Sequence, residues 1–202
     1  MYIIIKQVID FFIALILLIP TLIIVLISAI FIKLEDKGPV FYMASRSGLR
    51  GKPFRMYKLR TMIVDAPDIR TEDGSTFNSE SDPRVTKFGK FARKTSIDEL
   101  PQILNVLKGD MSFVGPRPDS ASYLNQYTDE EKIILTVRPG ITGYNQAINR
   151  NAVGTKEKLK NDIYYVNNMS FVFDCKIIVW TIKSVLSHKD VYRGEVSKDR
   201  KE

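Results

Sequence analysis

Cysteine and histidine are almost missing from this chain of 202 residues, and each absence excludes a class of site. The single cysteine, Cys175, cannot form an internal disulfide. The single histidine, His188, lies near the end of the chain, which argues against a His-rich metal site and against a Ser-His-Asp triad. No Walker A loop and no Rossmann glycine fingerprint occur, because Gly51-Lys52 and Gly89-Lys90 lack the required spacing. An aromatic-basic RNA motif is also missing, so no nucleic-acid partner is expected.

Charge is missing from one long segment near the start of the chain. Residues 11–32 contain no charged side chain and are dominated by Ile, Leu, Val and Phe, which is about the length that crosses a bilayer as a helix. Pro20 lies near the middle and should bend or break that helix. Two interpretations stay open from composition: a kinked single span, or a helical hairpin that turns at Ile19-Pro20-Thr21 and leaves on the face it entered.

The remainder of the chain is basic, with a net charge of +7. Such a balance favours anionic partners such as acidic lipid headgroups or nucleotide phosphates. Cations flank the apolar segment on both sides and are more numerous after it, where Lys33, Lys37, Arg46 and Arg50 follow. The positive-inside rule therefore places the large domain, residues 34–202, in the cytoplasm and residues 1–33 in the membrane.

Short elements separated by turns are predicted after the membrane segment. Residues 40–42 and 54–59 should be extended and joined by a turn-rich loop over 47–53. Helices are predicted over 86–95, from Leu100 to a C-cap at Gly109, in the second half of 119–136, over 155–167 and over 174–188. Residues 138–143 should form a turn. The fold class that follows is α+β and mostly helical.

Two segments each allow an ordinary structural interpretation and a functional one. Residues 65–82 are polar and should form a mobile surface loop, most simply an ordinary insertion. The last helix carries Ile177, Ile178 and Ile182 together with Trp180 and several lysines. That mixture suits an amphipathic helix lying at a membrane interface, and it suits equally a core-packed helix with exposed lysines.

The adjacent acids Asp98 and Glu99 are the strongest candidates for chemistry. Ser96 and Glu99 match a helix capping box, which would need no catalysis. Pro101 argues against a helix capped by Ser96, whereas a helix capped by Asp98 would have Pro101 in its first turn, where proline is tolerated. At the start of such a helix Asp98 stays ionised and could act as a nucleophile, while Glu99 could hold Mg²⁺ through its oxygens.

Several cations lie in short, stiff contexts that suit diphosphate oxygens. Proline fixes the backbone beside Arg117 and Arg138, and guanidinium forks match phosphate geometry. The candidate phosphate-binding residues are Lys58, Arg60, Arg93, Arg117, Arg138 and Arg150. Any one of them alone would be read as an ordinary solvated surface charge.

The chain resembles a known family from end to end. The matching stretches begin with Lys6-x-x-Ile-Asp10, Tyr57-Lys-Leu-Arg-Thr-Met62, Lys87-Phe-Gly-Lys-Phe-Ala-Arg93 and Thr95-Ser-Ile-Asp-Glu-Leu-Pro-Gln102. They continue with residues 105–118, Val137-Arg-Pro-Gly-Ile-Thr-Gly143 and Ser170-Phe-x-x-Asp174. In order and spacing they resemble the bacterial sugar transferases, which are monotopic polyprenyl-phosphate phosphoglycosyl transferases, and the length resembles the small, single-domain members.

The resemblance implies a reaction and a set of roles. A sugar 1-phosphate would move from a UDP-sugar to a polyprenyl phosphate, with undecaprenyl phosphate as the expected acceptor, and UMP would be released. Asp98 matches the nucleophile and Glu99 the residue that binds Mg²⁺. Substrate-binding positions match Lys58, Arg93, Arg117, Arg138 and Arg150, joined by Gln146, and Asp174 matches an acid near the site. The family's proline-broken helix is re-entrant, which favours the hairpin at the cytoplasmic face of the bacterial inner membrane; a homodimer is compatible with it.

Two departures from the family pattern concern the site. Asn149 stands where the family has glycine, which bears on the role of Arg150, and Ile19-Pro20 replaces a common Ser-Pro pair. A competing hypothesis is a non-enzymatic anchor that binds acidic lipid or recruits a partner. It explains the charge and the apolar run but leaves Asp98-Glu99 and the rigid arginines without a role.

Overall fold

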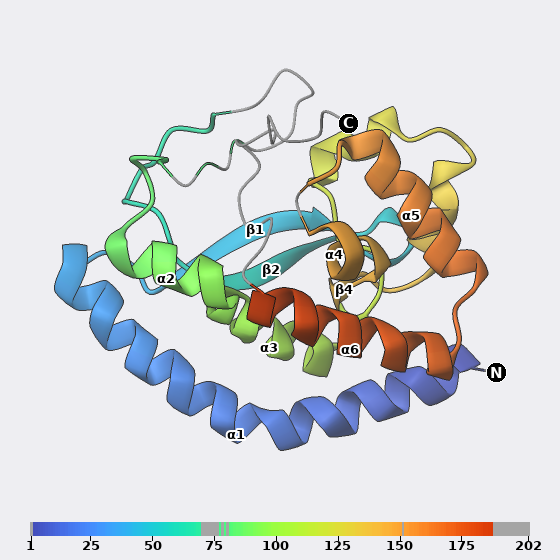
Figure 1. Cartoon of the computed structure of the whole chain (residues 1–202), viewed down its shortest axis with the longest axis horizontal. Helices are drawn as coiled ribbons and strands as arrows, with labels where there is room; N and C mark the ends of the chain where they lie inside the picture. Colours follow the sequence, from blue (N-terminus) through green and yellow to red (C-terminus); the bar gives the residue numbers. More distant parts are fainter. Residues whose placement is uncertain (1, 70–76, 78, 80, 151, 188–202) are drawn as a thin grey trace.

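The computed structural model describes residues 2–69, 77, 79, 81–150 and 152–187. One long helix, α1 (Tyr2–Asp36), runs along one side of a body made of all the other helices and strands (Figure 1). The body contains the helices α2 (Lys87–Thr95), α3 (Ile103–Lys108), α4 (Tyr144–Asn149), α5 (Thr155–Asn167) and α6 (Phe171–Ser187), with four short strands and four 3-10 helices. The predicted α+β, mostly helical class is confirmed.

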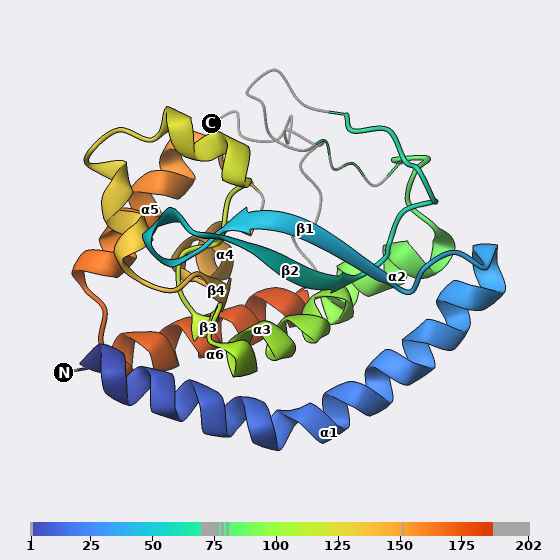
Figure 2. The same ribbon diagram turned by 180° about the vertical axis from the view of Figure 1, so that it is seen from behind.

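Helix α1 is continuous through Pro20 and bends near its middle (Figures 1 and 2). The expected hairpin with a turn at Ile19-Pro20-Thr21 is therefore corrected to one bent helix. Proline removes a single backbone donor and crowds the preceding turn, which a bend accommodates while the other helical hydrogen bonds persist. The side chains buried on the inner face of α1 recur every three to seven residues: Lys6, Asp10, Ala14, Thr21, Val25, Ser28 and Ile32.

The N-terminal end of α1 is fixed to the body by buried polar contacts. Lys6 Nζ lies 2.6 Å from Oδ2 of Asp174 on α6. The hydroxyl of Ser112 donates to Asp10 Oδ2 at 2.6 Å, and the Tyr2 hydroxyl also donates to Asp174. These contacts explain how charged residues at the edge of an apolar helix can be buried, since each has a partner of opposite charge or a hydrogen bond.

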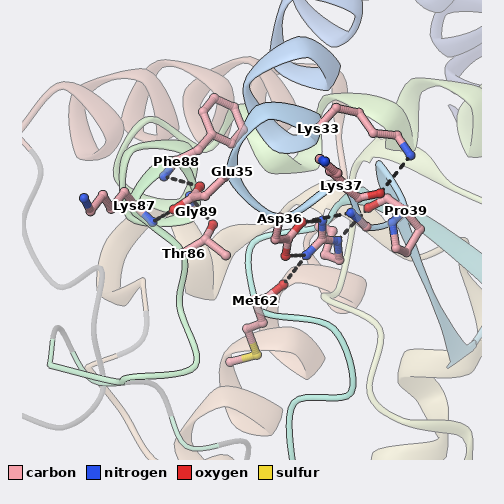
Figure 3. Close-up of polar contacts among 12 residues, drawn as sticks. Lys33, Glu35, Asp36, Lys37, Pro39, Met62, Thr86, Lys87, Phe88 and Gly89 are labelled. Atoms are coloured by element: carbon pink, nitrogen blue, oxygen red, sulfur yellow. Dashed lines mark hydrogen bonds and ion pairs between the residues drawn. The ribbon is translucent and has the colours of Figure 1, made fainter.

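The C-terminal end of α1 is fixed to the same body by a second set of contacts (Figure 3). The carboxylate of Glu35 accepts the backbone N–H groups of Lys87 and Phe88, at 2.6 and 3.1 Å, and so caps the start of α2. Asp36 forms a two-point ion pair with Arg60, whose guanidinium also donates to the carbonyls of Pro39 and Met62. Both ends of the apolar helix therefore meet one domain.

The β-hairpin predicted after the membrane segment is confirmed. Strands β1 (Phe41–Ser47) and β2 (Pro53–Leu59) pair antiparallel, with Phe41 opposite Leu59 and Ser47 opposite Pro53. Their connection is a tight turn with a 3-10 helix, η1 (Leu49–Gly51), in which Arg50 has a φ of 56°. Met56 and Leu59 of β2 face inward, where Met56 joins the cluster of Ala14, Ile103, Val106 and Met111 beneath α1.

The turn expected over residues 138–143 contains a strand instead. β4 (Gly140–Thr142) pairs in parallel with β3 (Ser112–Val114). The backbones approach so closely that a Cβ on Gly140 would lie 2.1 Å from the nitrogen of Gly115. Glycine is needed here because any side chain would push the two segments apart.

The other predicted helices are present, some with different bounds and some as 3-10 helices. α2 follows Thr86, whose hydroxyl caps Gly89 N, and α3 ends at Gly109 with a φ of 80°, as the C-cap prediction requires. α5 has the predicted bounds, and the described part of the last helix, α6, begins three residues early, at Phe171. The second half of residues 119–136, predicted to be helical, forms a 3-10 helix, η4 (Glu131–Thr136), and a further 3-10 helix, η3 (Ala121–Gln126), lies in the first half. Part of the 65–82 segment lies outside the described residues.

Candidate active site

Asp98 and Glu99 lie at the start of a 3-10 helix, η2 (Ile97–Gln102), which packs between α2 and α3 against strand β2. Neither capping frame considered for this segment is formed. Ser96 precedes η2 in the left-handed conformation, with a φ of 60° and no side-chain cap, and α3 itself starts only at Ile103. Because neither acid is used as a cap, their carboxylates are available to the neighbouring cations.

Glu99 is the acid held by cations. Its Oε1 accepts from Lys58 Nζ at 2.6 Å and from Arg117 Nη2 at 2.7 Å, and Arg117 Nη1 lies 3.3 Å from Oε2. Burial opposes ionisation, but the charges of Arg117 and Lys58 and their hydrogen bonds win and hold the pKa of Glu99 well below its usual range. Glu99 is therefore a carboxylate at any physiological pH.

Asp98 has no such clamp within the part of the chain that the structure describes. Its residue surface is only 8% exposed. Burial raises the pKa of Asp98 to about 6, and the negative charge of Glu99 adds to the rise, while Lys58, Arg93 and Arg117 oppose it. At neutral pH the carboxylate is ionised but poorly solvated, which is the condition of an activated nucleophile.

Two further predicted cations border the acid pair. Arg93 donates from Nε to Thr61 Oγ1 at 3.0 Å, and its charge acts on Asp98. Arg150 donates from Nη2 to Ser96 Oγ at 3.3 Å, so its guanidinium reaches the residue two before Asp98. Arg150 adopts a φ of 45° directly after Asn149, where the family has glycine.

Four predicted residues are placed away from direct contact with the acids. Arg60 is occupied by Asp36 at the end of α1, and Asp174 by Lys6, Tyr2 and Tyr165. Both are buried and serve to fix α1 to the body, so a substrate role for either stays a prediction without support from their contacts.

Arg138 and Gln146 keep unused polar atoms. Arg138 lies over the turn at Gly109, and its buried Nε has no hydrogen-bond partner among the described residues. Gln146 has a buried Oε1 that is likewise unpartnered there, close to Gly143. Among the described residues, neither contacts Asp98 or Glu99, and both retain capacity to bind a substrate.

A buried charge cluster beside Arg117 was not anticipated from the sequence. Lys158 on α5 lies 2.6 Å from Asp119 Oδ2 and 3.3 Å from Asp162 Oδ2, and the Tyr127 hydroxyl donates to the same Asp119 oxygen at 2.6 Å. Burial raises the pKa of Asp162 to about 6. The signal available was the four-residue spacing of Lys158 and Asp162 on one helix face, hidden by the charged character of the whole segment.

The donor set fits magnesium only in a limited way. Among the described residues, no group of three or more His, Cys, Asp and Glu side chains gathers as a metal site. Glu99 Oε2 has a single, longer contact, to Arg117 at 3.3 Å, and so keeps capacity for a cation. Mg²⁺ commonly binds through one or two carboxylates, several waters and substrate phosphates, so one carboxylate suffices if the substrate brings a diphosphate.

The site thus combines a buried Asp98 with a cation-held Glu99, on a body that carries, among the described residues, one helix long and apolar enough to cross a membrane. The family model "Bacterial sugar transferase" matches residues 1–188, and the chain belongs to this family. It is 45% identical to the "Uncharacterized sugar transferase EpsL" of Bacillus subtilis, with 91% of this chain and 88% of that protein covered.

Two further relatives have names that state a reaction. The chain is 40% identical to the "UDP-N-acetylgalactosamine-undecaprenyl-phosphate N-acetylgalactosaminephosphotransferase" of Aeromonas hydrophila, with 80% of this chain and 39% of the relative covered. It is 41% identical to the "UDP-glucose:undecaprenyl-phosphate glucose-1-phosphate transferase" of Escherichia coli, with 85% and 39% covered. The chain thus spans nearly all of one relative and about two fifths of the other two.

Proposed function

We propose that this chain transfers a sugar 1-phosphate from a UDP-sugar to a polyprenyl phosphate, most simply undecaprenyl phosphate, with release of UMP. The proposal rests on the difference between the two adjacent acids. Asp98 is buried and forms no ion pair among the described residues, while Glu99 forms ion pairs with Lys58 and Arg117. The names of the Aeromonas and Escherichia relatives support the donor and the acceptor. Because those two names contain different sugars, the sugar itself is left open.

The chemistry follows from Asp98 as nucleophile. A carboxylate oxygen of Asp98 attacks the β-phosphorus of the UDP-sugar, the bond to the bridging oxygen breaks, and UMP leaves with the electron pair. An acyl-phosphate between Asp98 and the sugar phosphate results. An oxygen of the polyprenyl phosphate then attacks the same phosphorus, the acyl-phosphate bond breaks, and the Asp98 carboxylate is restored.

The cations around the pair stabilise the charge that develops. Lys58, Arg93, Arg117 and Arg150 approach the acids from four different segments, so phosphate oxygens arriving at Asp98 meet preorganised donors. Arg138 and Gln146 are proposed as further substrate contacts because their buried polar atoms lack partners among the described residues. Glu99 would hold Mg²⁺, which when bound neutralises negative charge on the diphosphate.

The two fixed ends of α1 support a re-entrant placement in the membrane. A straight helix of 35 residues would be about 52 Å long, more than the roughly 30 Å hydrocarbon core requires. A spanning helix would leave its ends on opposite sides of the bilayer, yet Lys6 and Asp36 both bond to the same body. We therefore place the bent helix in one leaflet, with the body on the cytoplasmic face of the inner membrane.

Helix α6 supports the same placement. One face of α6 packs on the body, where Ile177 joins the core cluster of Val114, Ala147 and Tyr165, while most of its other apolar side chains stay exposed. Its exposed large apolar side chains are Phe171, Val172, Ile178, Val179, Ile182 and Leu186. Such a helix, with lysines beside its apolar face, suits the interfacial plane. An acceptor with its phosphate at the interface would then meet Asp98 without leaving the bilayer.

The test is release of UMP from a panel of UDP-sugars in the presence of undecaprenyl phosphate and Mg²⁺. Wild-type protein should release UMP with at least one sugar, and Asp98→Asn should release none. Asp129→Asn, which alters an exposed acid on the surface, serves as the matched control and should behave as wild type. If no sugar supports release while the Escherichia relative turns over in the same assay, the anchor hypothesis is favoured instead.

A further inference from the structure

Arg117 owes its position to a short, stiff segment of backbone. It lies between Pro116 and Pro118, after β3 and before η3, and its fork holds Glu99. Proline fixes φ on either side, so the direction of the Arg117 side chain depends on where the segment as a whole is anchored. The next residue, Asp119, supplies that anchor.

Asp119 is fixed through both its side chain and its backbone. Its Oδ2 accepts from Lys158 Nζ and from the Tyr127 hydroxyl, both at 2.6 Å. Its carbonyl oxygen accepts from the backbone nitrogen and the hydroxyl of Ser47, at 3.0 and 3.1 Å. Charge-assisted contacts of this length are the stronger kind of hydrogen bond.

Lys158 is held in place by a second acid, Asp162, on its own helix α5. The residue is 8% exposed and lies between Asp119 and Asp162, and Asp162 has no exposed surface. An ammonium with acids on both sides is retained in this interior because moving it would leave a buried carboxylate without a counter-charge. Charges thus alternate from Glu99 through Arg117, Asp119 and Lys158 to Asp162.

The start of the segment is held by backbone bonds to β4: Gly115 N donates to the carbonyl of Thr142 at 2.9 Å, and Gly140 N donates to the carbonyl of Pro116 at 3.0 Å. Ser47 holds the backbone at the other end, at Asp119. A small void bordered by Pro116, Pro118 and Pro139 lies against the segment between these points. The ion pair of Asp119 with Lys158 is therefore the side-chain contact that ties the end of the segment to α5.

We propose that Lys158 is a positioning residue for the transferase site: through Asp119 it holds the Pro116–Pro118 segment so that Arg117 faces Glu99 and Asp98. This inference rests on the proposed function for its activity readout but not for its structural readout. The charged groups that act on Asp98 are Lys58 from β2, Arg93 from α2, the neighbouring Glu99, and Arg117. Moving Arg117 away removes one of the three cations that favour the ionised form of Asp98.

The experiment compares Lys158→Met, Lys158→Arg and Asp119→Asn with wild type. The Asn variant keeps the size of Asp119 and the charge of Lys158, so it tests the same contact if the Met variant fails to fold. Tyr165→Phe is the matched control, because it removes a buried hydroxyl that bonds to Asp174 and Val114 and has no contact with the Asp119 cluster. Two quantities are measured: the side-chain guanidinium ¹⁵N resonances of Arg117 without substrate, which report its contact with Glu99, and the separate values of kcat and KM.

Loss of the Asp119–Lys158 contact should move the guanidinium resonances of Arg117 toward those of a free arginine, because its fork on Glu99 is loosened. The value of kcat/KM should fall about 10- to 100-fold, with the loss in kcat rather than in KM. Lys158→Arg should recover most of both effects, and Tyr165→Phe should change neither. Unchanged Arg117 resonances in both Asp119→Asn and a folded Lys158→Met, or an equal change in Tyr165→Phe, would overturn the proposal. If wild type releases no UMP, the proposed function fails while the NMR measurement still decides the positioning role.

Discussion

Arg117 holds Glu99 at two points, with Nη2 2.7 Å from Oε1 and Nη1 3.3 Å from Oε2. This fork gives the two adjacent acids different electrostatic surroundings. Glu99 remains ionised under all physiological conditions, whereas burial brings the pKa of Asp98 to about 6. Two neighbouring titratable groups with pKa values pushed apart are typical of sites where each group has its own role.

The activity should fall at acid pH, because a protonated Asp98 cannot act as the nucleophile. Because the pKa of Asp98 is raised to about 6, the nucleophilic carboxylate predominates above that pH and disappears below it. We expect kcat/KM to fall about tenfold per pH unit below the midpoint. Initial rates between pH 5 and pH 8 measure this, and a profile that stays flat down to pH 5 would show that the nucleophile has an ordinary acid pKa.

Arg117→Lys should damage the site although it keeps the charge. A single ammonium cannot contact both oxygens of Glu99, so the fork is lost and Glu99 gains freedom to turn. We expect kcat/KM to fall by about 10- to 100-fold, with the loss mainly in kcat if the fork acts in the transition state. Steady-state kinetics with a saturating acceptor provide the measurement. Arg55→Lys, on the exposed side of β2, is the control and should be neutral.

Both ends of α1 should be reachable from one side of the membrane. Cys175 is exposed and would be replaced by Ser, after which single cysteines are placed at Ile4 and at Leu34, which are both exposed. In sealed inner-membrane vesicles, an impermeant thiol reagent should label both positions only when the cytoplasmic face is accessible. Labelling of the two positions from opposite faces would establish a spanning helix and remove the re-entrant placement.

Lys6→Met should destabilise the protein by breaking a buried ion pair. The Lys6 and Asp174 side chains are 11% and 6% exposed, so the variant leaves a buried carboxylate without its cation. We expect a loss of about 3 kcal/mol in the free energy of unfolding. Chemical denaturation in detergent measures it. The double variant Lys6→Met with Asp174→Asn should be less destabilised than the single one, and equal losses would show that the pair is not coupled.

Local signals in the sequence predicted local structure well. A turn-rich loop between two extended stretches predicted the hairpin of β1 and β2. Gly109 was predicted as the C-cap after α3, and the structure confirms it. The parallel pair of β3 and β4 could not be predicted, because each strand has three residues and its partner lies far along the chain. Strands this short have no periodicity to detect.

The choice of site residues shows a similar division. Asp98 and Glu99 were identified from their position in the chain, and Lys58, Arg93, Arg117 and Arg150 lie around them. The sequence does not show which side chain an arginine or an aspartate will pair with. Arg60 and Asp174 were therefore grouped with the site, although their contacts fix the ends of α1. Lys158 was missed because a charged helix normally faces solvent, and only the fold shows that this lysine is buried between two acids.

The most direct test of the account is the mass of the protein after reaction with donor alone. Incubation with a UDP-sugar and Mg²⁺, in the absence of polyprenyl phosphate, should add one sugar-phosphate mass, and the adduct should map to the peptide that contains Asp98. Asp98→Asn should fold as stably as wild type or more so at neutral pH, because it removes a buried charge, and should gain no mass. A donor that turns over with acceptor while the protein never carries the adduct, or an adduct that persists in Asp98→Asn, would contradict the assignment of Asp98 as nucleophile.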